Sequence, residues 1–417
     1  MSKSIAIIGG GPAGSTLASF LAKKGYKVGV FQSKKHPELF VGESLVPAIM
    51  PIIQELGIEE EVKQFSRLKP GATVWVSPDI AASIEFSQSE GQVPDYAYNT
   101  LRKDFDKLLF DTAKKNGATI FNFNAGLQVQ GDRILLNEET LTETGDFFDG
   151  QPNLIIDASG RRKVITNLLK LNTVQGNRKD VALFSHMKNI DLKQEPSNIH
   201  THRCEKGWCW RIPLQDRTSI GIVVDQNHLK KYGKSTEEQF DNYIQNDPFL
   251  APFFKSGERI AGVQKFSNYQ LRTDKLFGPN WAIIGDAAGF VDPVFSSGLY
   301  LAMKYGRKVA EAVQGETYSF EDYQNEFTKE LESWKKIINT WYNGRFFTTY
   351  LIGQDRSATA FGKRIEPHIV KNFSRIFTGE AVTGRYSMSL YLFMSGPLQD
   401  FMKLFRMHKY NKQDYAL

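Results

Sequence analysis

Three glycines near the N-terminus could bind a phosphate group. Gly9, Gly11 and Gly14 have the spacing GxGxxG within "GGGPAG", a stretch that also contains Ala13. Glycines at this spacing let the backbone approach a pyrophosphate, and the helix behind them offers free N–H groups to the anion. Because the pattern is specific only between a strand and a helix, its flanking sequence must be examined.

The flanking sequence fits such a turn. A β-branched run covers 4–8, helical spacing continues over 15–24, and a second strand follows at 26–31. Gln32 ends that strand in place of the expected acid, and its amide can bond a ribose hydroxyl without the charge of a carboxylate. We predict a dinucleotide site with a loosely held adenosine end; the alternative is a tight turn without a ligand.

A second segment pairs a strand end with a helix start. The strand predicted at 281–284 leads into Gly285 and Asp286, whose carboxylate can bind a ribose hydroxyl. Further along, Ser296 and Ser297 are natural caps for a helix from about Gly298, whose N–H groups face an anion.

Two tryptophans stand one residue apart in "GWCWRIP" at 207–213. On a strand, residues i and i+2 face the same side, so Trp208 and Trp210 should form one continuous indole surface. Pro213 cannot donate to a sheet and marks an edge or a strand end. Composition alone favours core packing over a reactive site.

Composition limits the class of protein. A chain of 417 residues with 41% hydrophobic and 24% charged residues forms two or three packed units of an ordinary globular protein. Two cysteines, Cys204 and Cys209, are too few for a disulfide framework, so we expect a cytoplasmic protein. The stretch 4–22 is uncharged, but its glycines and Pro12 would break a helix, so we expect no membrane span. His200 and His202 have no third ligand at a familiar spacing, so we predict exposed loop histidines and no metal site.

The positive charge is concentrated at the C-terminal end. From residue 333 onward, 13 basic residues stand against 5 acids, which gives +8, whereas the whole chain carries +6. Such a surface attracts an acidic partner, and the alternative is a solvated helical face. We do not expect a nucleic-acid partner.

Several segments together resemble the flavin-dependent halogenases, a branch of the hydroxylase-type FAD enzymes. "WCWRIP" is similar to their WxWxIP signature, and "FVDPVFSSG" to their FxxPxxSxG loop. "VGESLVPAIM", "LKPGATVWV", "RKDFDKLL" and "DASGRR" resemble further segments in the same order. The resemblance implies FAD as the cofactor, and the cofactor-binding residues that it implies are Gly9, Gly11, Ala13, Gly14, Gln32, Glu43, Ser44, Arg102, Gly285, Asp286 and Pro293. For Arg102, a helix-surface salt bridge is the alternative.

In that family, reduced FAD and O2 convert a halide to hypohalous acid, which travels to a separate substrate pocket. The resemblance implies that Trp208 and Trp210 keep the organic substrate away from the flavin. It also implies that Ser296, Ser297 and Gly298 hold chloride or bromide in a nest of backbone N–H groups. We find no second GxGxxG, so we expect a separate flavin reductase to supply FADH2.

The family's essential lysine corresponds to Lys69 in "RLKPGATVWV". Pro70 restricts Lys69 to an extended backbone, which helps to aim the side chain. Buried beside apolar walls, its ammonium could hydrogen-bond hypohalous acid, or its neutral amine could become a haloamine. The alternative is a surface charge.

One departure from the family bears on the substrate. Tryptophan halogenases carry a glutamate before the two small residues of the halide loop, where this chain has Phe295. We therefore expect an electron-rich phenol or pyrrole as the substrate. Together with the basic C-terminal end, this predicts that the ring is carried on an acidic carrier protein of natural-product biosynthesis, and the alternative is a free phenol that diffuses in unaided. The alternatives are a halogenase-like monooxygenase, which hydroxylates an aromatic substrate or a partner protein's side chain, and a non-catalytic flavin-binding protein.

These residues need a particular architecture to meet. We predict an α/β fold with a parallel-sheet, Rossmann-like FAD-binding domain, an antiparallel β substrate domain and a helical C-terminal region. The predicted FAD-binding domain comprises 1–75, 100–178 and 268–318. The substrate domain comprises 76–99 and 179–267, and the helical region covers 319–417 and closes over the substrate side.

Overall fold

The computed structural model describes residues 3–32, 39–192, 195–267, 270–315 and 317–417. Its first sheet follows the glycine turn and has the order β19-β20-β10-β1-β2-β7, in which all neighbours are parallel except β19 and β20. Its strands are β1 (Ser4–Ile8), β2 (Lys27–Phe31), β7 (Thr119–Phe121), β10 (Leu154–Asp157), β19 (Phe277–Gly278) and β20 (Trp281–Ile283). The strands predicted at 4–8, 26–31 and 281–284 are confirmed to within one residue.

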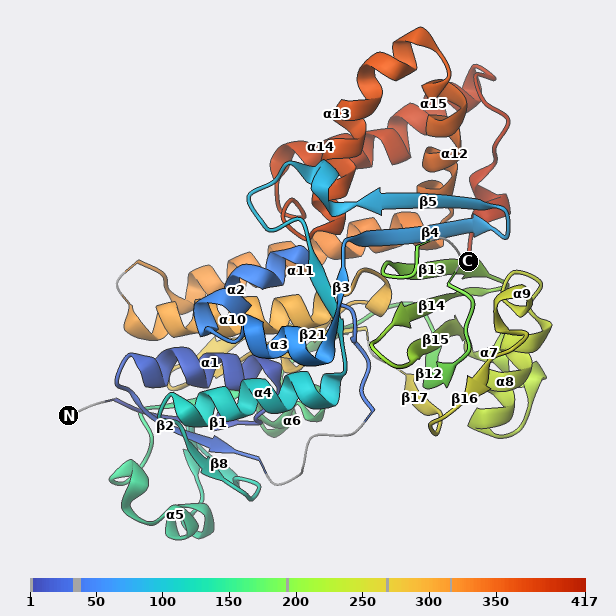
Figure 1. Cartoon of the computed structure of the whole chain (residues 1–417). Helices are drawn as coiled ribbons and strands as arrows, with labels where there is room; N and C mark the ends of the chain where they lie inside the picture. Colours follow the sequence, from blue (N-terminus) through green and yellow to red (C-terminus); the bar gives the residue numbers. More distant parts are fainter. Residues whose placement is uncertain (1–2, 33–38, 193–194, 268–269, 316) are drawn as a thin grey trace.

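Helices form a layer along one face of this sheet (Figure 1). They are α1 (Pro12–Lys23), α2 (Met50–Leu56), α3 (Glu59–Phe65), α4 (Arg102–Lys115) and α10 (Ser297–Gln314). Pro12 at the first helical position starts α1, because its fixed φ suits a helix and its missing N–H costs nothing there. On the opposite side lie the hairpin of β8 (Leu127–Gln130) and β9 (Arg133–Leu136), and α5 (Glu138–Thr144). The short α6 (Val164–Leu168) follows β10.

The second large sheet has the order β16-β12-β15-β14-β13-β4-β5, and β17 also pairs with β12. Its strands are β4 (Gly71–Ser77), β5 (Ile80–Glu85), β12 (Asp180–Lys188), β13 (Ile199–Cys204), β14 (Gly207–Pro213), β15 (Thr218–Asp225), β16 (Glu258–Arg259) and β17 (Gln264–Ser267). The sheet is antiparallel as predicted, except that β13 and β4 run parallel. Because β4 begins at Gly71, the sheet also takes residues that the predicted boundary assigned to the FAD-binding domain.

Two small sheets and three short helices accompany the two large sheets. β3 (Ser66–Lys69) pairs with β6 (Ala97–Thr100), and β18 (Leu271–Thr273) lies between β11 (Thr173–Gln175) and β21 (Gly289–Phe290). Beside the large sheet lie α7 (Gln226–Leu229), α8 (Thr236–Asn246) and α9 (Ala251–Phe254).

The C-terminal region is helical, as predicted, and most of it forms the upper part of the molecule in Figure 1. A capping box between Ser319 and Asp322 starts its first helix. The helices are α11 (Phe320–Tyr342), α12 (Arg345–Ser357), α13 (Ala360–Phe377), α14 (Arg385–Phe393) and α15 (Gln399–Leu404). A short π-helical segment, η8 (Met394–Leu398), joins α14 to α15, so that the three form one continuous helix. Within the described ranges, no helix combines the length and apolar character that a membrane span requires.

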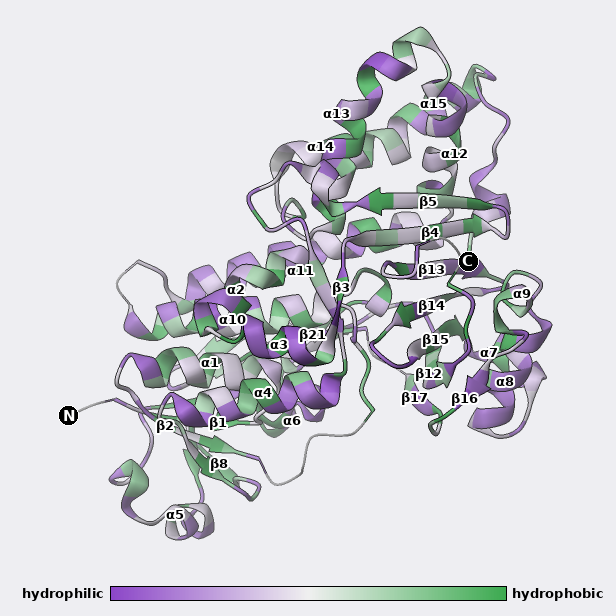
Figure 2. Ribbon diagram, viewed as in Figure 1, coloured by the Kyte–Doolittle hydropathy of each residue, from purple (hydrophilic) through white to green (hydrophobic). Residues whose placement is uncertain are grey.

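One core joins all of these layers. The same cluster of buried hydrophobic residues includes Ile7 of β1, Trp208 of β14, Leu331 of α11 and Tyr391 of α14. A second cluster fills the space between the other face of the large sheet and α8. Figure 2 shows hydrophobic residues along the central strands β12, β14 and β15, and hydrophilic residues over α3 and α8.

Candidate functional site

The glycine turn joins the end of β1 to α1. A Cβ on Gly14 would lie 2.0 Å from the carbonyl oxygen of Gly9, and one on Gly9 would lie 2.5 Å from that of Ala158. A Cβ on Gly11 would meet nothing within 4 Å, so the backbone is open there. No side chain caps α1, and its first turn has no acid. The turn therefore offers an anion free N–H groups and the positive end of the helix dipole.

Two of the side chains predicted around the cofactor, Gln32 and Arg102, already have partners within the protein. The Gln32 Oε1 atom accepts a hydrogen bond from the Gly10 N–H (2.9 Å), so this amide secures the turn itself. Arg102 forms a buried two-pronged ion pair with Asp106 (2.7 and 2.8 Å) and donates to the Val41 carbonyl (2.6 Å). Burial alone would lower the pKa of Arg102, but Asp106 outweighs burial and the pKa is raised. Arg102 thus forms a salt bridge within its helix, as the alternative interpretation predicted, but this salt bridge is buried and does not lie on the surface.

Glu43 and Ser44 behave differently from each other. Both carboxylate oxygens of Glu43 lie 3.0 Å from His186 Nε2, which ties this segment to β12. The Ser44 hydroxyl is buried without a hydrogen-bond partner in the described structure. A buried unpaired hydroxyl is costly, so Ser44 is better placed than Glu43 to contact a ligand.

A cavity of about 130 Å³ lies beside the second predicted segment. Asp286 and Pro293 line it, and burial raises the pKa of Asp286 while Arg102, Arg161 and Lys163 oppose that rise. The Lys163 ammonium is buried without a hydrogen-bond partner in the described ranges. The lining residues are Phe40, Val41, Arg161, Lys163, Ala182, Phe266, Leu271, Asp286, Phe290 and Pro293. Arg161 and the unpaired Lys163 ammonium, beside apolar side chains, fit an anionic ring system such as a reduced flavin.

Gly285 brings the two predicted segments together. A Cβ on Gly285 would lie 2.9 Å from the Cβ of Ala13, so only a glycine allows this approach. The glycine turn and the segment containing Asp286 therefore adjoin, as one dinucleotide requires.

The predicted halide loop has the backbone of an anion nest. A short 3-10 turn, η7 (Pro293–Phe295), precedes Ser296, which adopts the left-handed conformation (φ 55°). This sequence of conformations directs successive N–H groups into one concavity. The Ser296 N–H donates to the Pro293 carbonyl (3.1 Å), so the N–H groups of Ser297 and Gly298, at the start of α10, are the candidate anion donors. Contrary to expectation, the Ser296 side chain does not cap α10.

Trp208 and Trp210 lie on one side of β14, as their spacing predicts. Their ring centroids are 5.6 Å apart, and the side chains are 1% and 4% exposed. The Phe184 ring packs against Trp210, with the ring centroids 6.1 Å apart. It also stacks on Phe266, with the centroids 5.6 Å apart, and Phe266 lines the cavity described above. The indoles and Phe184 thus form a continuous layer of buried aromatic rings that reaches the cavity through Phe266.

The sequence did not reveal the network that holds Trp208. The Trp208 indole donates to the Tyr342 hydroxyl (3.0 Å), which donates to Asp292 (2.8 Å). Asp292 also accepts from the Val294 N–H (3.0 Å), so one carboxylate connects the halide loop to the tryptophan. Burial raises the pKa of Asp292 to about 7. Its place in "FVDPVFSSG" could have identified Asp292, but nothing in the sequence pointed to Tyr342.

Phe295 fills the place of the glutamate found in tryptophan halogenases. Its ring lies 5.9 Å from Trp341, 6.3 Å from Trp334 and 5.4 Å from Phe377. It therefore packs within aromatic rings from α11 and α13, and a carboxylate there would have to be desolvated.

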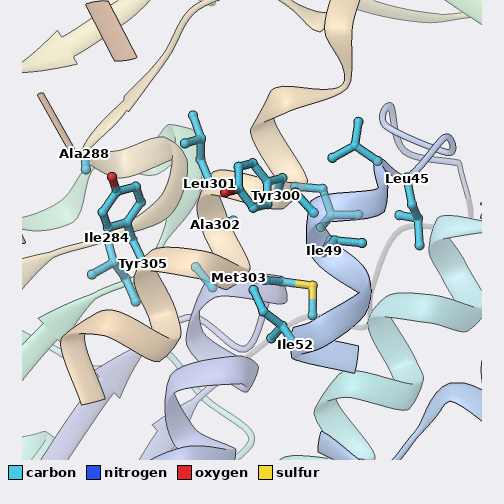
Figure 3. Packing of buried hydrophobic residues seen from close by; sticks show 14 of the residues in the cluster. Leu45, Ile49, Ile52, Ile284, Ala288, Tyr300, Leu301, Ala302, Met303 and Tyr305 are labelled. Atoms are coloured by element: carbon cyan, nitrogen blue, oxygen red, sulfur yellow. The ribbon is translucent and has the colours of Figure 1, made fainter. Parts of the chain in front are cut away.

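Lys69 is buried at the end of β3, where Pro70 stops the strand. Its Nζ donates to the Leu45 carbonyl (2.7 Å) and lies 5.2 Å from the Phe86 ring. Among the described residues it forms no ion pair, and burial lowers its pKa to about 7. Figure 3 shows Leu45 and Ile49 on the side of α10 that carries Tyr300. The lysine is therefore not a surface charge, and its acceptor packs against the helix that begins at the halide loop.

The prediction for the two histidines was wrong. His200 and His202 are buried in β13, not exposed in a loop. His200 Nδ1 accepts from the Trp75 indole (3.1 Å), and Arg211 Nε donates to His202 Nε2 (2.8 Å). Burial, then Arg211, lowers the pKa of His200 to about 4. In the described part of the chain, no cluster of side chains suits a metal ion.

Comparisons with known proteins show the family to which the chain is similar. The family model "Tryptophan halogenase" matches residues 4–87 and 76–350. The 1H-pyrrole-2-carbonyl-[peptidyl-carrier protein] chlorinase of Pseudomonas fluorescens is 28% identical over 84% of this chain and 86% of its own length. The flavin-dependent halogenase armH3 of Armillaria mellea is 31% identical over 75% of this chain and 67% of its own length.

Solved structures share the fold. A flavoprotein/dehydrogenase from Cytophaga hutchinsonii superposes with a TM-score of 0.81 at 24% identity, over 97% of this chain and all of that one. The flavin-dependent brominase Bmp2 gives 0.77 at 22% identity, over 98% of this chain and all of its own.

Proposed function

Because the chain belongs to the tryptophan halogenase family and is a flavin-dependent halogenase, we propose that Lys69 transfers the halogen to an electron-rich aromatic ring. The observation that carries the proposal is the burial of Lys69, which has no acidic partner among the described residues and whose pKa burial lowers to about 7. A lysine that is retained in such an environment costs stability, and a catalytic role accounts for it.

We propose that FAD binds between the glycine turn and the cavity beside Asp286. Gly9, Gly11, Ala13 and Gly14 would hold the pyrophosphate, and Gly285, Asp286 and Pro293 would line the ring end. Roles for Gln32, Glu43, Ser44 and Arg102 in cofactor binding stay predictions. The unpaired Lys163 ammonium supports an anionic ligand in this cavity. When bound, reduced FAD with O2 supplies the oxidising equivalent that converts a halide to hypohalous acid.

The protein's own groups would then direct the halogen. Backbone N–H groups of Ser297 and Gly298 would hold chloride or bromide, and Trp208 with Trp210 would keep the organic substrate from the flavin side. At Lys69, an ammonium would donate a hydrogen bond to hypohalous acid and polarise it toward the ring. Alternatively, the neutral amine would form a haloamine and water, and then exchange its halogen for a ring proton. A pKa of about 7 makes both protonation states available near neutral pH.

We propose a phenol or pyrrole substrate bound to an acidic carrier protein. Phe295 supports such a ring, since it offers no carboxylate base and only an electron-rich ring reacts without one. The Pseudomonas relative is named for a pyrrole-2-carbonyl group on a peptidyl carrier protein. The charge of +8 from residue 333 onward supports an acidic partner. A separate flavin reductase would supply FADH2, and the unpaired, buried Cys204 and Cys209 are consistent with a cytoplasmic location.

The product of one incubation tests the activity. Protein supplied with reduced FAD, O2, bromide and a simple phenol should yield bromophenol, detected by mass spectrometry. A hydroxylated phenol would identify a monooxygenase, and peroxide alone would identify a flavin protein without this activity; either result contradicts the proposal.

A second measurement tests the carrier. Rates on free and carrier-bound substrate, compared at low and high salt, should differ in favour of the carrier at low salt, because screening weakens attraction between charged proteins. Equal rates at both salt concentrations would remove the carrier from the proposal and leave the halogenase activity intact.

A further inference from the structure

The continuous helix formed by α14, η8 and α15 exposes large hydrophobic side chains to solvent. Leu404 is 75% exposed, Phe405 61% and Phe401 54%. Six of the twelve exposed large hydrophobic residues of the described chain lie on this helix or just beyond its end. We call them the outer helix face: Tyr386, Phe393, Phe401, Leu404, Phe405 and Met407. Single exposed residues of this kind are normal, but a continuous row marks a binding surface.

Helical spacing places four of these six residues on one side of the helix. Tyr386, Phe393, Phe401 and Leu404 are separated by seven, eight and three residues, which is close to whole helical turns. The other side is buried and fastened to the protein. Ser387 donates to Asn372 (2.7 Å), and Gln399 donates to Thr348 (2.7 Å). The inner side of the helix is thus held by these hydrogen bonds and by Tyr391, which is buried in the core, while further hydrophobic side chains face outward.

Positive charge borders the outer helix face. Lys403, Arg406 and Lys409 are exposed, and the described structure pairs none of them with an acid. The helix has one acid, Asp400, which Arg345 (2.7 Å) and Lys412 (3.5 Å) neutralise. The border therefore carries a net positive charge beside the exposed phenylalanines.

We propose that the outer helix face binds the surface of a membrane that contains anionic lipids. Helices that lie in the headgroup region of a membrane combine phenylalanine and leucine with lysine and arginine. Their rings insert between the lipids, and their cations contact the lipid phosphates. The inference goes beyond halogenation and does not depend on it.

Other occupants fit the surface less well. A second copy would bring the same cations, including Lys403 and Arg406, against one another. An acidic protein would satisfy the charges, but a protein helix would bind such rings in a groove. The outer helix face lines neither the cavity beside Asp286 nor a second cavity of about 210 Å³, which Arg272 and Glu332 help to line. A bilayer surface covers a convex row of rings without a groove.

Vesicle co-sedimentation of the full-length protein tests the proposal. The probes are vesicles of phosphatidylcholine alone and of phosphatidylcholine mixed with phosphatidylglycerol. The wild type should partition at least about tenfold better onto the anionic vesicles. Phe401→Ser with Leu404→Ser, and separately Lys403→Glu with Arg406→Glu, should each reduce that partition at least about fivefold. Because these side chains are exposed, melting temperatures and bromination of a free phenol without vesicles should stay at wild-type values.

Val129→Ser is the matched control, since Val129 is 44% exposed but lies on β8, outside the outer helix face. The control should bind vesicles as the wild type does. Equal wild-type partition onto both vesicle types would overturn the proposal, as would wild-type binding by the Phe401 and Leu404 variant. Light scattering that shows a dimer, dissociated by that same variant, would assign the surface to a second copy. Binding to an acidic carrier protein, abolished by that variant and without vesicle binding, would assign it to a protein.

Discussion

Replacing Lys69 with methionine should abolish halogenation and, at neutral or lower pH, make the protein more stable. Burial lowers the pKa of Lys69 from its ordinary value of 10.5 to about 7. At about 1.4 kcal/mol for each pH unit, keeping this lysine charged inside the protein costs on the order of 5 kcal/mol. Methionine has a similar shape and no charge, so Lys69→Met removes that cost. The variant loses the hydrogen bond to the Leu45 carbonyl, which costs about 1–3 kcal/mol. The net gain below pH 7 is therefore about 2–4 kcal/mol.

The gain has a defined pH dependence. Between pH 7 and 10.5 the unfolded wild-type chain holds the Lys69 proton and the folded protein does not, so wild-type stability rises with pH. The advantage of Lys69→Met should be complete below pH 7 and should shrink by about 1.4 kcal/mol for each pH unit above it. Near pH 10.5 it should be reversed, because only the lost hydrogen bond to Leu45 remains there. Chemical denaturation across this range measures it, and product analysis with reduced FAD and bromide measures halogenation. FAD binding should be unchanged. Lys188→Met, at an exposed position, should show neither effect. Equal stabilities of Lys69→Met and wild type at pH 6, with halogenation retained, would refute both the burial argument and the assignment of Lys69.

The remaining predictions concern the cofactor turn, the indole layer and its supports. Gly14→Ala should abolish FAD binding, measured by flavin fluorescence, because its Cβ would lie 2.0 Å from the Gly9 carbonyl oxygen. Trp210→Ala should cost about 3 kcal/mol or more and release peroxide, seen as oxygen consumption in excess of halogenated product. Phe295→Glu should destabilise the protein by at least about 3 kcal/mol in denaturation, without gaining activity on free tryptophan, since the carboxylate would be buried among rings. Tyr342→Phe removes a hydrogen bond that opposes the raised pKa of Asp292, so the loss of stability with rising pH should extend above pH 7.

The sequence predicted the fold well for elements whose structure depends mainly on their own residues. The strand at Ser4–Ile8, the glycine turn and the strand Gly207–Pro213 follow from β-branched runs, glycine spacing and a terminal proline. The parallel pairing of β13 with β4 was missed, because strand order depends on contacts between residues more than a hundred positions apart. No period in either strand encodes that partner.

In the candidate site, too, local features could be predicted from the sequence, and features that depend on distant contacts could not. The common face of Trp208 and Trp210 follows from strand geometry, and the extended backbone of Lys69 follows from Pro70. Tyr342 lies 134 positions from Trp208, so its hydrogen bond arises only when α11 packs on β14. His200 and His202 were misjudged because two polar residues in "HTH" suggested a loop, whereas Trp75, Arg211 and the Glu195 carbonyl satisfy them inside the sheet.

The larger hydrophobic cluster limits how this enzyme can be recombined. Ile7, Trp208, Leu331 and Tyr391 belong to one buried cluster, so no layer of apolar side chains ends at the boundary near residue 319. A chimera that takes its C-terminal helices from a relative would set foreign side chains against Trp208 and the halide loop. Such a graft would change substrate range and protein yield together, and a library for altered substrates should vary facing residues on both sides of that junction at once.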